Sequence, residues 1–250
     1  MDIALLIIGS QLLDGTRKDQ HTDHAIGVLN QYGLKLTSSH IVGNDPGLIT
    51  RCLRNSMEHG DVVFVFGGIG CTPDDHTRAC AAQAAGVALV RHPQGAKEIE
   101  AQFREAAYPH RIHMADLPEG CTLIPNPVNR TPGFSIQRHH FLPGFREMAW
   151  PMMEWVLDHA FVAERRDPPV EHLIRIRTAR EHDLLDLMES FVRRFPDVGF
   201  SSLPHLLENG ADLELGLRGK DVAVRHSMKW LTSELDVRGY GWEARRQRLF

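Results

Sequence analysis

The sequence predicts an α/β protein with a three-layer, mostly parallel sheet, joined to a second, small α+β domain. Two short, continuous apolar runs, residues 3–8 and 61–66, each end at a glycine, which is typical of strands buried on both faces of a parallel sheet. Helical patterns alternate with these runs. A polar segment with two adjacent prolines, residues 163–170, is typical of a linker and predicts the domain boundary.

The first 90 residues carry the evidence for the parallel sheet. Three helical patterns surround the second apolar run, and each stops at a glycine that suits a helix end. They cover residues 19–32, 46–59 and 73–85, before Gly33, Gly60 and Gly86. Strands that alternate with helices of this length are joined by right-handed crossovers in a parallel sheet, with helices on its faces.

Residues 117–145 differ in character, because five prolines separate short β-like pieces. These pieces cover residues 121–124, 133–137 and 140–142, and we expect the loops between them to line a cleft. An aromatic-rich helical pattern over residues 145–160 completes a first domain of residues 1–162.

The chain after the linker, residues 171–250, predicts a small α+β domain. Its patterns indicate a strand at 172–178, a helix at 180–195, strands near 198–203 and 213–217, and a helix from Lys220.

Composition excludes several classes of protein. Apolar residues make up 42% and charged residues 24% of the 250, so disordered and collagen-like chains are excluded. A net charge of −4 argues against sequence-independent binding of duplex nucleic acid. The apolar run at the N-terminus is too short for a membrane span and lacks the features of a signal peptide, so we expect a cytoplasmic protein. The four widely spaced cysteines indicate reduced thiols.

Residues 67–77, GGIGCTPDDHT, form the segment that says most about chemistry. They leave a buried strand through glycines and lead into a helical pattern. Glycines allow backbone N–H groups to approach a ligand closely, and a helix N-terminus adds free donors, so the segment suits a phosphate or pyrophosphate. The spacing matches neither the dinucleotide fingerprint nor a P-loop.

Asp74 and Asp75 allow two hypotheses. They could hold a divalent cation against a bound phosphate. Alternatively, Thr72 caps the helix, Pro73 takes its first position and Asp75 completes a capping box, which leaves Asp74 without a structural role. Cys71 also lies in this loop, and we interpret it as a small residue rather than a nucleophile.

At this point the sequence resembles a known family. The matching pieces are IIGSQLLDG (7–15), IVGNDPGLI (41–49), GDVVFVFGGIGCTPDDHTR (60–78), MADLPEG (114–120), NPVNRTPGF (126–134) and LPGFREM (142–148). Together they resemble the MoaB/Mog molybdopterin-binding fold, and most of all its branch in the competence/damage-inducible protein A (CinA) family. Residues 170–250 are similar, more weakly, to the KH-like domain that follows it. The deamidase domain of full-length members is not in this sequence, so nicotinamide mononucleotide deamidation is not expected.

The resemblance implies a cleft for a nucleotide or pterin phosphate and, for the CinA branch, metal-dependent hydrolysis of ADP-ribose to AMP and ribose 5-phosphate. It implies a divalent metal, magnesium by preference, as cofactor. Four positions depart from the family: Gln11 replaces Glu, His21 replaces Asn, Asn44 replaces Asp, and Cys71 replaces Pro. Two acids are therefore missing, which leaves open a non-catalytic molybdopterin- or nucleotide-binding protein. A molybdopterin adenylyltransferase is a further alternative.

The expected site combines these arguments. The predicted catalytic and metal-binding residues are Asp74 and Asp75, and the predicted phosphate- or nucleotide-binding residues are Gly9, Gly67, Gly68, Gly70, Thr72, Asn126, Pro143 and Gly144. We expect a small-molecule ligand, no membrane and a homo-oligomer. We also expect no nucleic-acid partner, because the GLRG at 216–219 follows a strand and is interpreted as a turn rather than an RNA-clamping loop.

Overall fold

The computed structural model describes residues 3–207 and 210–245. The chain divides into two compact units. The larger unit holds residues 1–29 and 34–165, and the smaller unit holds residues 30–33 and 166–250. None of the helices in the described part of the chain is long and apolar enough to cross a membrane.

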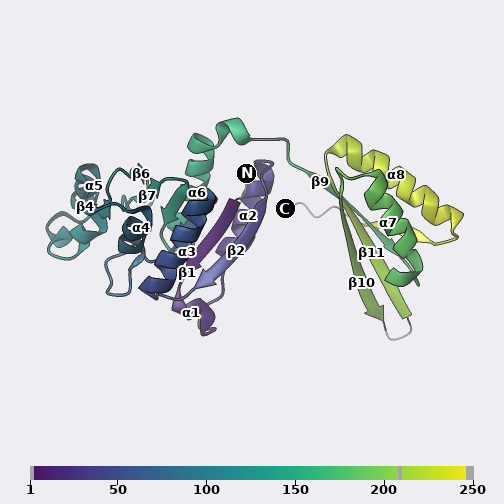
Figure 1. The fold of residues 1–250 in the computed structure, drawn as a ribbon, viewed down its shortest axis with the longest axis horizontal. Coiled ribbons are helices and arrows are strands. Elements are labelled where there is room, and N and C mark those ends of the chain that lie inside the picture. The colour runs from purple at the N-terminus through teal and green to yellow at the C-terminus, as the bar shows by residue number, and fades with distance from the viewer. Residues whose placement is uncertain (1–2, 208–209, 246–250) are drawn as a thin grey trace. The chain divides into compact units, whose positions relative to one another are not determined.

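A six-stranded mixed sheet forms the centre of the larger unit (Figure 1), with the order β2-β1-β3-β8-β7-β6. The strands are β1 (Ile3–Ile8), β2 (Leu36–Val42), β3 (Val62–Phe66), β6 (Thr122–Ile124), β7 (Gly133–Ile136) and β8 (His139–Leu142). The first four strands in this order run parallel, and β7 pairs antiparallel with both of its neighbours. The predicted α/β fold with a mostly parallel sheet is confirmed.

Helices cover both faces of this sheet, so the unit has three layers. On one face, α3 (Pro46–His59) and α4 (Thr77–Ala85) pack through Ile49, Leu53 and Ala81 against alternate residues of β1 and β3. On the other face lie α2 (His21–Gln31) and α6 (Arg146–Ala160). His21 stacks on Phe66 of β3 and Phe161, just after α6, lies against Phe64. The central strands β1 and β3 are buried along their whole length, as their continuous apolar runs predict.

Several elements of this unit carry no strong sequence signal. The edge strand β2 has the polar sequence LTSSHIV and is mostly exposed, so no apolar period marks it. Between α4 and β6 lie the two-stranded pair of β4 (Leu89–Arg91) and β5 (Asp116–Pro118), the helix α5 (Pro93–Phe103), and the 3₁₀ turns at Arg104–Ala107 and Arg111–Ala115. A four-residue helix, α1 (Ser10–Leu13), follows β1.

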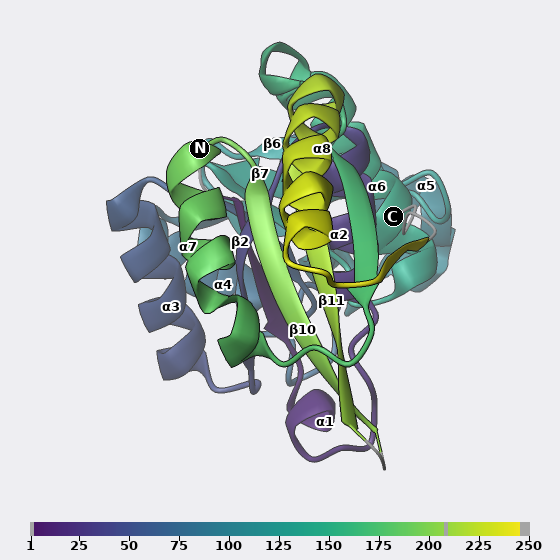
Figure 2. The same ribbon diagram turned by 90° about the vertical axis from the view of Figure 1, so that its right-hand side faces the viewer.

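The smaller unit has the order βαββαβ. After a 3₁₀ turn at Val162–Glu164, it comprises β9 (Val170–Ile176), a 3₁₀ turn (Glu181–Leu184), α7 (Leu185–Arg194), β10 (Gly199–Leu207), β11 (Gly210–Gly219), α8 (Asp221–Val237) and β12 (Trp242–Arg245). Its antiparallel sheet has the order β10-β11-β9-β12, which is the split βαβ arrangement of ferredoxin-like domains. Both helices cover one face of this sheet (Figures 1 and 2) and bury its apolar core.

The GLRG segment at 216–219 is not a turn, so that prediction is wrong. Gly216 to Gly219 belong to β11: all four residues pair with β9, and Gly216 to Arg218 also pair with β10. A side chain at Gly216 would meet Ser201 Oγ at 2.4 Å and Leu173 Cδ2 at 3.0 Å, so the crowded sheet requires glycine there. These residues do not form a loop between helices, and the KH-like resemblance of this unit stays a prediction.

Candidate functional site

A cleft of about 910 Å³ opens in the larger unit where the parallel strands end. The residues that directly follow β1, β3 and β8 are Gly9, Gly67 and Pro143, and all three line it. Open α/β sheets bind ligands at this edge because the loops that leave neighbouring strands meet there. The sheet order thus brings together three sequence-distant glycine- and proline-containing loops.

The glycine loop, residues 67–76, leaves β3 in a backbone conformation that suits glycine. Gly67 and Gly68 have φ of 99° and 70°. A Cβ at Gly67 would lie 2.5 Å from the Ile8 carbonyl oxygen, and one at Gly68 would lie 2.1 Å from Thr77 Oγ1. Both positions therefore exclude a side chain, and glycine allows the loop to pack closely against the end of β1 and the start of α4.

The helix after this loop begins later than the sequence predicts. Helix α4 starts at Thr77, not at Pro73, and its N-cap residue His76 makes no side-chain cap. The Thr77 N–H donates to the Gly68 carbonyl at 3.0 Å, and its hydroxyl donates to the Gly67 carbonyl at 3.0 Å. These bonds fold the loop back onto the helix start. The prediction that Thr72 and Pro73 open the helix is therefore wrong, and His76 and Thr77 do not line the cleft.

Asp74 and Asp75 both line the cleft from a turn that precedes α4. The Thr72 hydroxyl lies 2.7 Å from Asp74 Oδ1 and 2.5 Å from Asp75 Oδ2, and the Thr72 N–H donates to Asp75 Oδ2 at 2.8 Å. Asp75 thus closes the turn as it would close a capping box, although no helix begins there. Thr72 holds the two carboxylates side by side.

Asn44 reaches Asp74 from the loop after β2. Its Nδ2 donates to Asp74 Oδ2 at 3.2 Å, while its Oδ1 accepts from the Ser10 N–H at 2.9 Å. The bond from the Thr72 hydroxyl favours the charged carboxylate and keeps the pKa of Asp74 below its ordinary value. Asp74 is therefore an anion at neutral pH.

The donor set suits a magnesium ion only if the ligand completes it. Among residues 3–207 and 210–245, no group of three or more His, Cys, Asp or Glu side chains is arranged to hold a metal. Magnesium in phosphate-processing sites is often held by one or two carboxylates together with substrate phosphates and water. Asp74 and Asp75 meet this requirement, and Gln11, which also lines the cleft, adds an amide rather than a charge.

His21 forms part of the floor of the cleft. Its side chain is buried, stacks on Phe66 with 4.4 Å between the ring centroids, and lies with Nε2 3.3 Å from the Gly144 carbonyl oxygen. Burial lowers the pKa of His21 below its ordinary value. The residue is therefore a neutral packing element that supports Gly144.

The start of helix α6 forms another side of the cleft. Residues 143–148 line it, and the N-cap residue Phe145 offers no side chain to the first helical N–H groups. The Met148 and Ala149 N–H groups bond to the Phe145 carbonyl. The N–H groups of Arg146 and Glu147, at the positive end of the helix dipole, are then suited to an anion. Helix α6 therefore supplies the anion-binding helix N-terminus that the sequence predicted after the glycine loop.

Four basic side chains in the cleft were missed by sequence reasoning. Their positions are Arg17, Lys18, Arg111 and Arg146. Arg146 stands at a predicted helix start after Pro143 and Gly144, so its neighbourhood offered a signal. Arg111 offered none, because its 3₁₀ segment has no period and lies far from the glycine loop in sequence. With Asp19, Asp74, Asp75 and Glu147, the lining holds equal numbers of basic and acidic side chains.

Asn126 does not line the cleft. Its side chain is buried and holds a turn: Nδ2 donates to Asn129 Oδ1 at 2.8 Å and to the Thr131 carbonyl at 2.9 Å, and Oδ1 accepts from the Val128 N–H at 3.0 Å. Asn129 and Thr131 line the cleft instead. Asn126 therefore positions its neighbours in the turn, with its own amide already occupied.

The other predicted site residues all reach the cleft. Those that line it are Gly9, Gly67, Gly68, Gly70, Thr72, Asp74, Asp75, Pro143 and Gly144. The four family departures line it as well, namely Gln11, His21, Asn44 and Cys71.

Comparison with known proteins gives a family for the larger unit. A family model described as a probable molybdopterin binding domain matches residues 4–162. This range contains every residue of the cleft. The resemblance noted from the sequence motifs is confirmed at the level of this domain.

Two relatives indicate how far the similarity extends. A protein of Pyrobaculum arsenaticum is 28% identical over 222 residues, which cover 84% of this chain and 82% of the relative. A CinA-like protein of Syntrophotalea carbinolica is 32% identical over 165 residues, which cover 63% of this chain and 40% of the relative. The chain thus spans less than half of that CinA-like protein.

A solved structure supports the fold. A crystal structure of the protein CinA, of unknown function, from Thermoplasma acidophilum aligns with this chain with a TM-score of 0.58 at 23% identity. The alignment covers 63% of this chain and 98% of that one.

Proposed function

This chain belongs to the family of probable molybdopterin binding domains, and we propose that its cleft binds a nucleotide or pterin phosphate and hydrolyses the pyrophosphate of an ADP-ribose-like dinucleotide. One observation carries the proposal. A single cleft gathers the glycine loop, the first turn of α6, four basic side chains and the Asp74–Asp75 pair. Backbone amides and cations bind phosphates, and paired carboxylates suit a cation that bridges to them.

Each group has a role in binding. Gly67, Gly68 and Gly70 line the cleft, and the pyrophosphate would approach the backbone of this loop closely. Arg146, at the start of α6, neutralises phosphate charge together with the helix N-terminus. Thr72 orients both aspartates, and Asn44 fixes Asp74 from the opposite loop. The pyrophosphate is therefore held between the cationic side and the carboxylates.

Asp74 and Asp75 would hold a divalent cation, magnesium by preference. Bound there, the cation would supply Lewis acidity toward the phosphoryl oxygens and activation of water. In the overall reaction, a water oxygen forms a new bond to phosphorus and the bridging P–O bond breaks. ADP-ribose would give AMP and ribose 5-phosphate.

A non-catalytic carrier of a molybdopterin or nucleotide is the second candidate, favoured by one observation. Position 11 in the cleft is a glutamine, which can neither accept a proton as a general base nor add charge to a metal site. With glutamine at position 11, only the glycine loop contributes carboxylates to this side of the cleft, namely those of Asp74 and Asp75. A molybdopterin adenylyltransferase would use the same cleft and is an alternative within the enzyme class.

Binding and turnover of ADP-ribose, measured side by side with and without magnesium, test the proposal. We expect binding by calorimetry and release of AMP that depends on the metal. Asp74→Asn should weaken metal-dependent binding by about 10-fold or more, because a charged ligand contact is lost, while the unfolding midpoint changes little at this exposed position.

Matched variants separate the candidates. Gln11→Glu should raise metal-dependent AMP release if the missing acid limits turnover. Asn55→Asp, on the far end of α3 and outside the cleft lining, is the control for an added carboxylate and should change nothing. Binding without AMP release in every variant would favour the carrier, and failure to bind any nucleotide or pterin phosphate would refute both.

A further inference from the structure

We infer that Arg78 is a positioning residue that ties the glycine loop to a second wall of the cleft, residues 111–116, and so holds Arg111 where one ligand can contact both. The inference deepens the proposed function and rests on it for the identity of the ligand. It makes Arg111 the contact for a second anionic group of that ligand, beyond the phosphate at the glycine loop.

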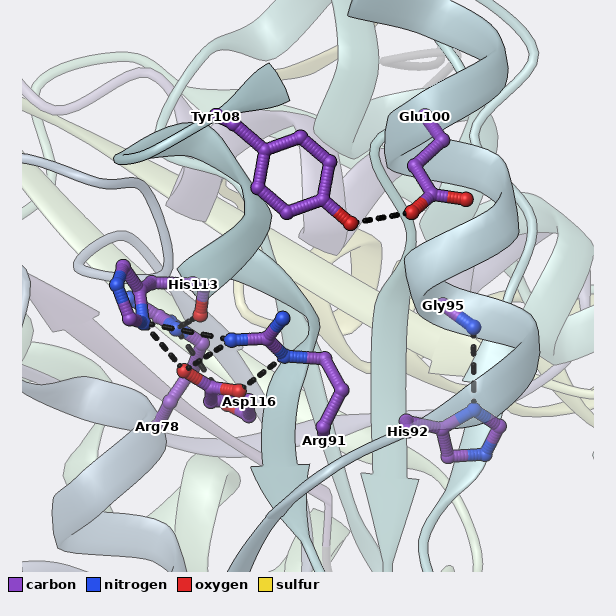
Figure 3. A network of polar contacts seen from close by, with 8 residues as sticks. All are labelled: Arg78, Arg91, His92, Gly95, Glu100, Tyr108, His113 and Asp116. Carbon is purple, nitrogen blue, oxygen red and sulfur yellow. Dashed lines mark hydrogen bonds and ion pairs between the residues drawn. The ribbon is translucent and has the colours of Figure 1, made fainter.

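Arg78 bridges two segments that are distant in sequence. From the first turns of α4, its Nη2 donates to the Gly70 carbonyl at 2.6 Å. Its Nη1 donates to the carbonyl of His113 and, at 3.4 Å, to the carbonyl of Asp116 (Figure 3). One guanidinium therefore bonds to the glycine loop on one side and to the second wall on the other.

The free-energy cost of burying the Arg78 guanidinium indicates that the bridge is a specific feature of the fold. Arg78 is 9% exposed, and burial lowers its pKa, although an arginine remains charged. A buried charge is tolerated when it is hydrogen-bonded, and the three carbonyls accept from Nη1 and Nη2, while Nε has no partner in the described part of the chain. Lysine has no planar fork and cannot satisfy the same set of acceptors in these directions.

The second wall is firmly held and presents ligand-facing groups. Arg91 donates from Nε and Nη2 to the Asp116 carboxylate at 2.5 and 3.2 Å, and His113 Nδ1 lies 2.7 Å from the same group (Figure 3). Arg111 and Met114 of this wall line the cleft. The Arg111 guanidinium bonds to the Ala106 carbonyl at 2.8 Å and lies over the Phe103 ring, so its direction is fixed.

Two sets of anion-binding groups thus face one cleft from walls that Arg78 joins. The glycine loop presents backbone, and the second wall presents the Arg111 cation. A ligand with anionic groups at both places gains from their fixed separation, because the protein spends no further entropy in ordering the walls. An orthophosphate ion carries a single anionic group and should gain nothing from the second wall.

Arg78→Lys tests the bridge, with Arg91→Lys as the matched control. Arg91 holds the same wall through the Asp116 side chain, but it has no hydrogen bond to the glycine loop. We expect Arg78→Lys to accelerate amide exchange by about 10-fold in both 67–77 and 111–116, and Arg91→Lys to do so in 111–116 alone. Acceleration of one segment or neither in Arg78→Lys would overturn the bridge, whether or not the protein binds ADP-ribose.

Affinity for ADP-ribose tests the consequence for the ligand. Arg111→Gln should weaken binding about 10- to 100-fold, the loss of a charged hydrogen bond, and leave orthophosphate binding unchanged. In the Arg78→Lys background the same substitution should have less than a third of that effect, because the segment that carries Arg111 is then no longer joined to the glycine loop. Independent, additive effects of the two substitutions would overturn the positioning role.

If Arg78→Lys fails to fold, the wild-type protein decides. Saturating ADP-ribose should slow exchange in 67–77 and 111–116 together, and protection of the glycine loop alone would refute the inference. Absence of ADP-ribose binding in the wild-type protein would instead refute the proposed function, and wherever Arg78→Lys folds, its amide exchange decides the bridge without any ligand.

Discussion

Gly68→Ala provides a test of the geometry of the glycine loop, with Gly86→Ala as its control. Both glycines have nearly the same φ, 70° and 71°. A Cβ at Gly86, after α4, would have no atom within 4 Å, whereas one at Gly68 would lie 2.1 Å from Thr77 Oγ1 and 3.2 Å from Thr77 Cβ. The two substitutions therefore share the backbone cost and differ in the overlap.

The expected magnitudes follow from this difference. Gly86→Ala should lower the free energy of unfolding by about 1 to 2 kcal/mol, the cost of a left-handed conformation with a Cβ. Gly68→Ala adds roughly 1 to 3 kcal/mol for overpacking against the buried Thr77 side chain. Displacing the Thr77 hydroxyl also removes its bond to the Gly67 carbonyl, worth about 0.5 to 1.5 kcal/mol. The total of about 2.5 to 6.5 kcal/mol is a large part of a typical stability of 5 to 15 kcal/mol.

Urea unfolding followed by circular dichroism measures the effect, and amide exchange in β3 assigns the transition to the larger unit. The double variant Gly68→Ala with Thr77→Ala should be less destabilised than the sum of its single variants, because the overlapping atom is gone. A Gly68→Ala variant that loses no more stability than Gly86→Ala would refute the assigned loop conformation.

Three further predictions concern pH, domain organisation and partners. Burial lowers the pKa of His139 and His140 to about 4. Because these imidazoles take up protons near pH 6.5 in the unfolded chain, the free energy of unfolding should fall by roughly 3 kcal/mol for each of them as the pH drops from 6.5 to 4. His140→Gln should therefore flatten the profile of urea midpoints against pH. Mild proteolysis should release a stable N-terminal fragment that ends within 161–170, whereas cuts scattered through 1–150 with that segment intact would contradict two independent domains. The full chain should bind neither RNA nor DNA at submicromolar concentration in physiological salt. On the sheet of the smaller unit Arg175 is paired with Asp212 and Arg177 with Glu243, so these cations are already neutralised. Tight, salt-resistant binding in a filter assay would contradict this.

Local sequence patterns predicted most of the elements that build the sheet. The run at Ile3–Ile8 is strand β1, and the helix Pro46–His59 has the predicted bounds, with Asp45 accepting from the Leu48 N–H and Gly60 closing the helix in a left-handed conformation. These signals are strong because each depends on neighbours in the chain: the apolar period, a cap and a terminating glycine. The smaller unit was predicted in the same way, except for β12, a short strand with one partner.

Other features depended on contacts that no local pattern records. The first four residues of the predicted helix at 73–85 form a turn instead. The Thr77 N–H donates to the Gly68 carbonyl, and the Thr72 hydroxyl bonds to both the Asp74 and Asp75 carboxylates. The exposed edge strand β2 is held by its pairing with β1, not by an apolar face.

The sequence by itself determined the parallel sheet, the glycine loop at its carboxyl edge and the presence of Asp74 and Asp75 in that loop, because these follow from hydrophobic period and from residue type along a short stretch of chain. Only the tertiary structure decided which cations share the cleft with them. Arg111 arrives on a segment without periodic pattern, and Arg78 connects that segment to Gly70 through backbone carbonyls, which every residue carries. A bond to a carbonyl leaves no mark on the sequence of its acceptor, so the second wall of the site became visible only once the chain was folded.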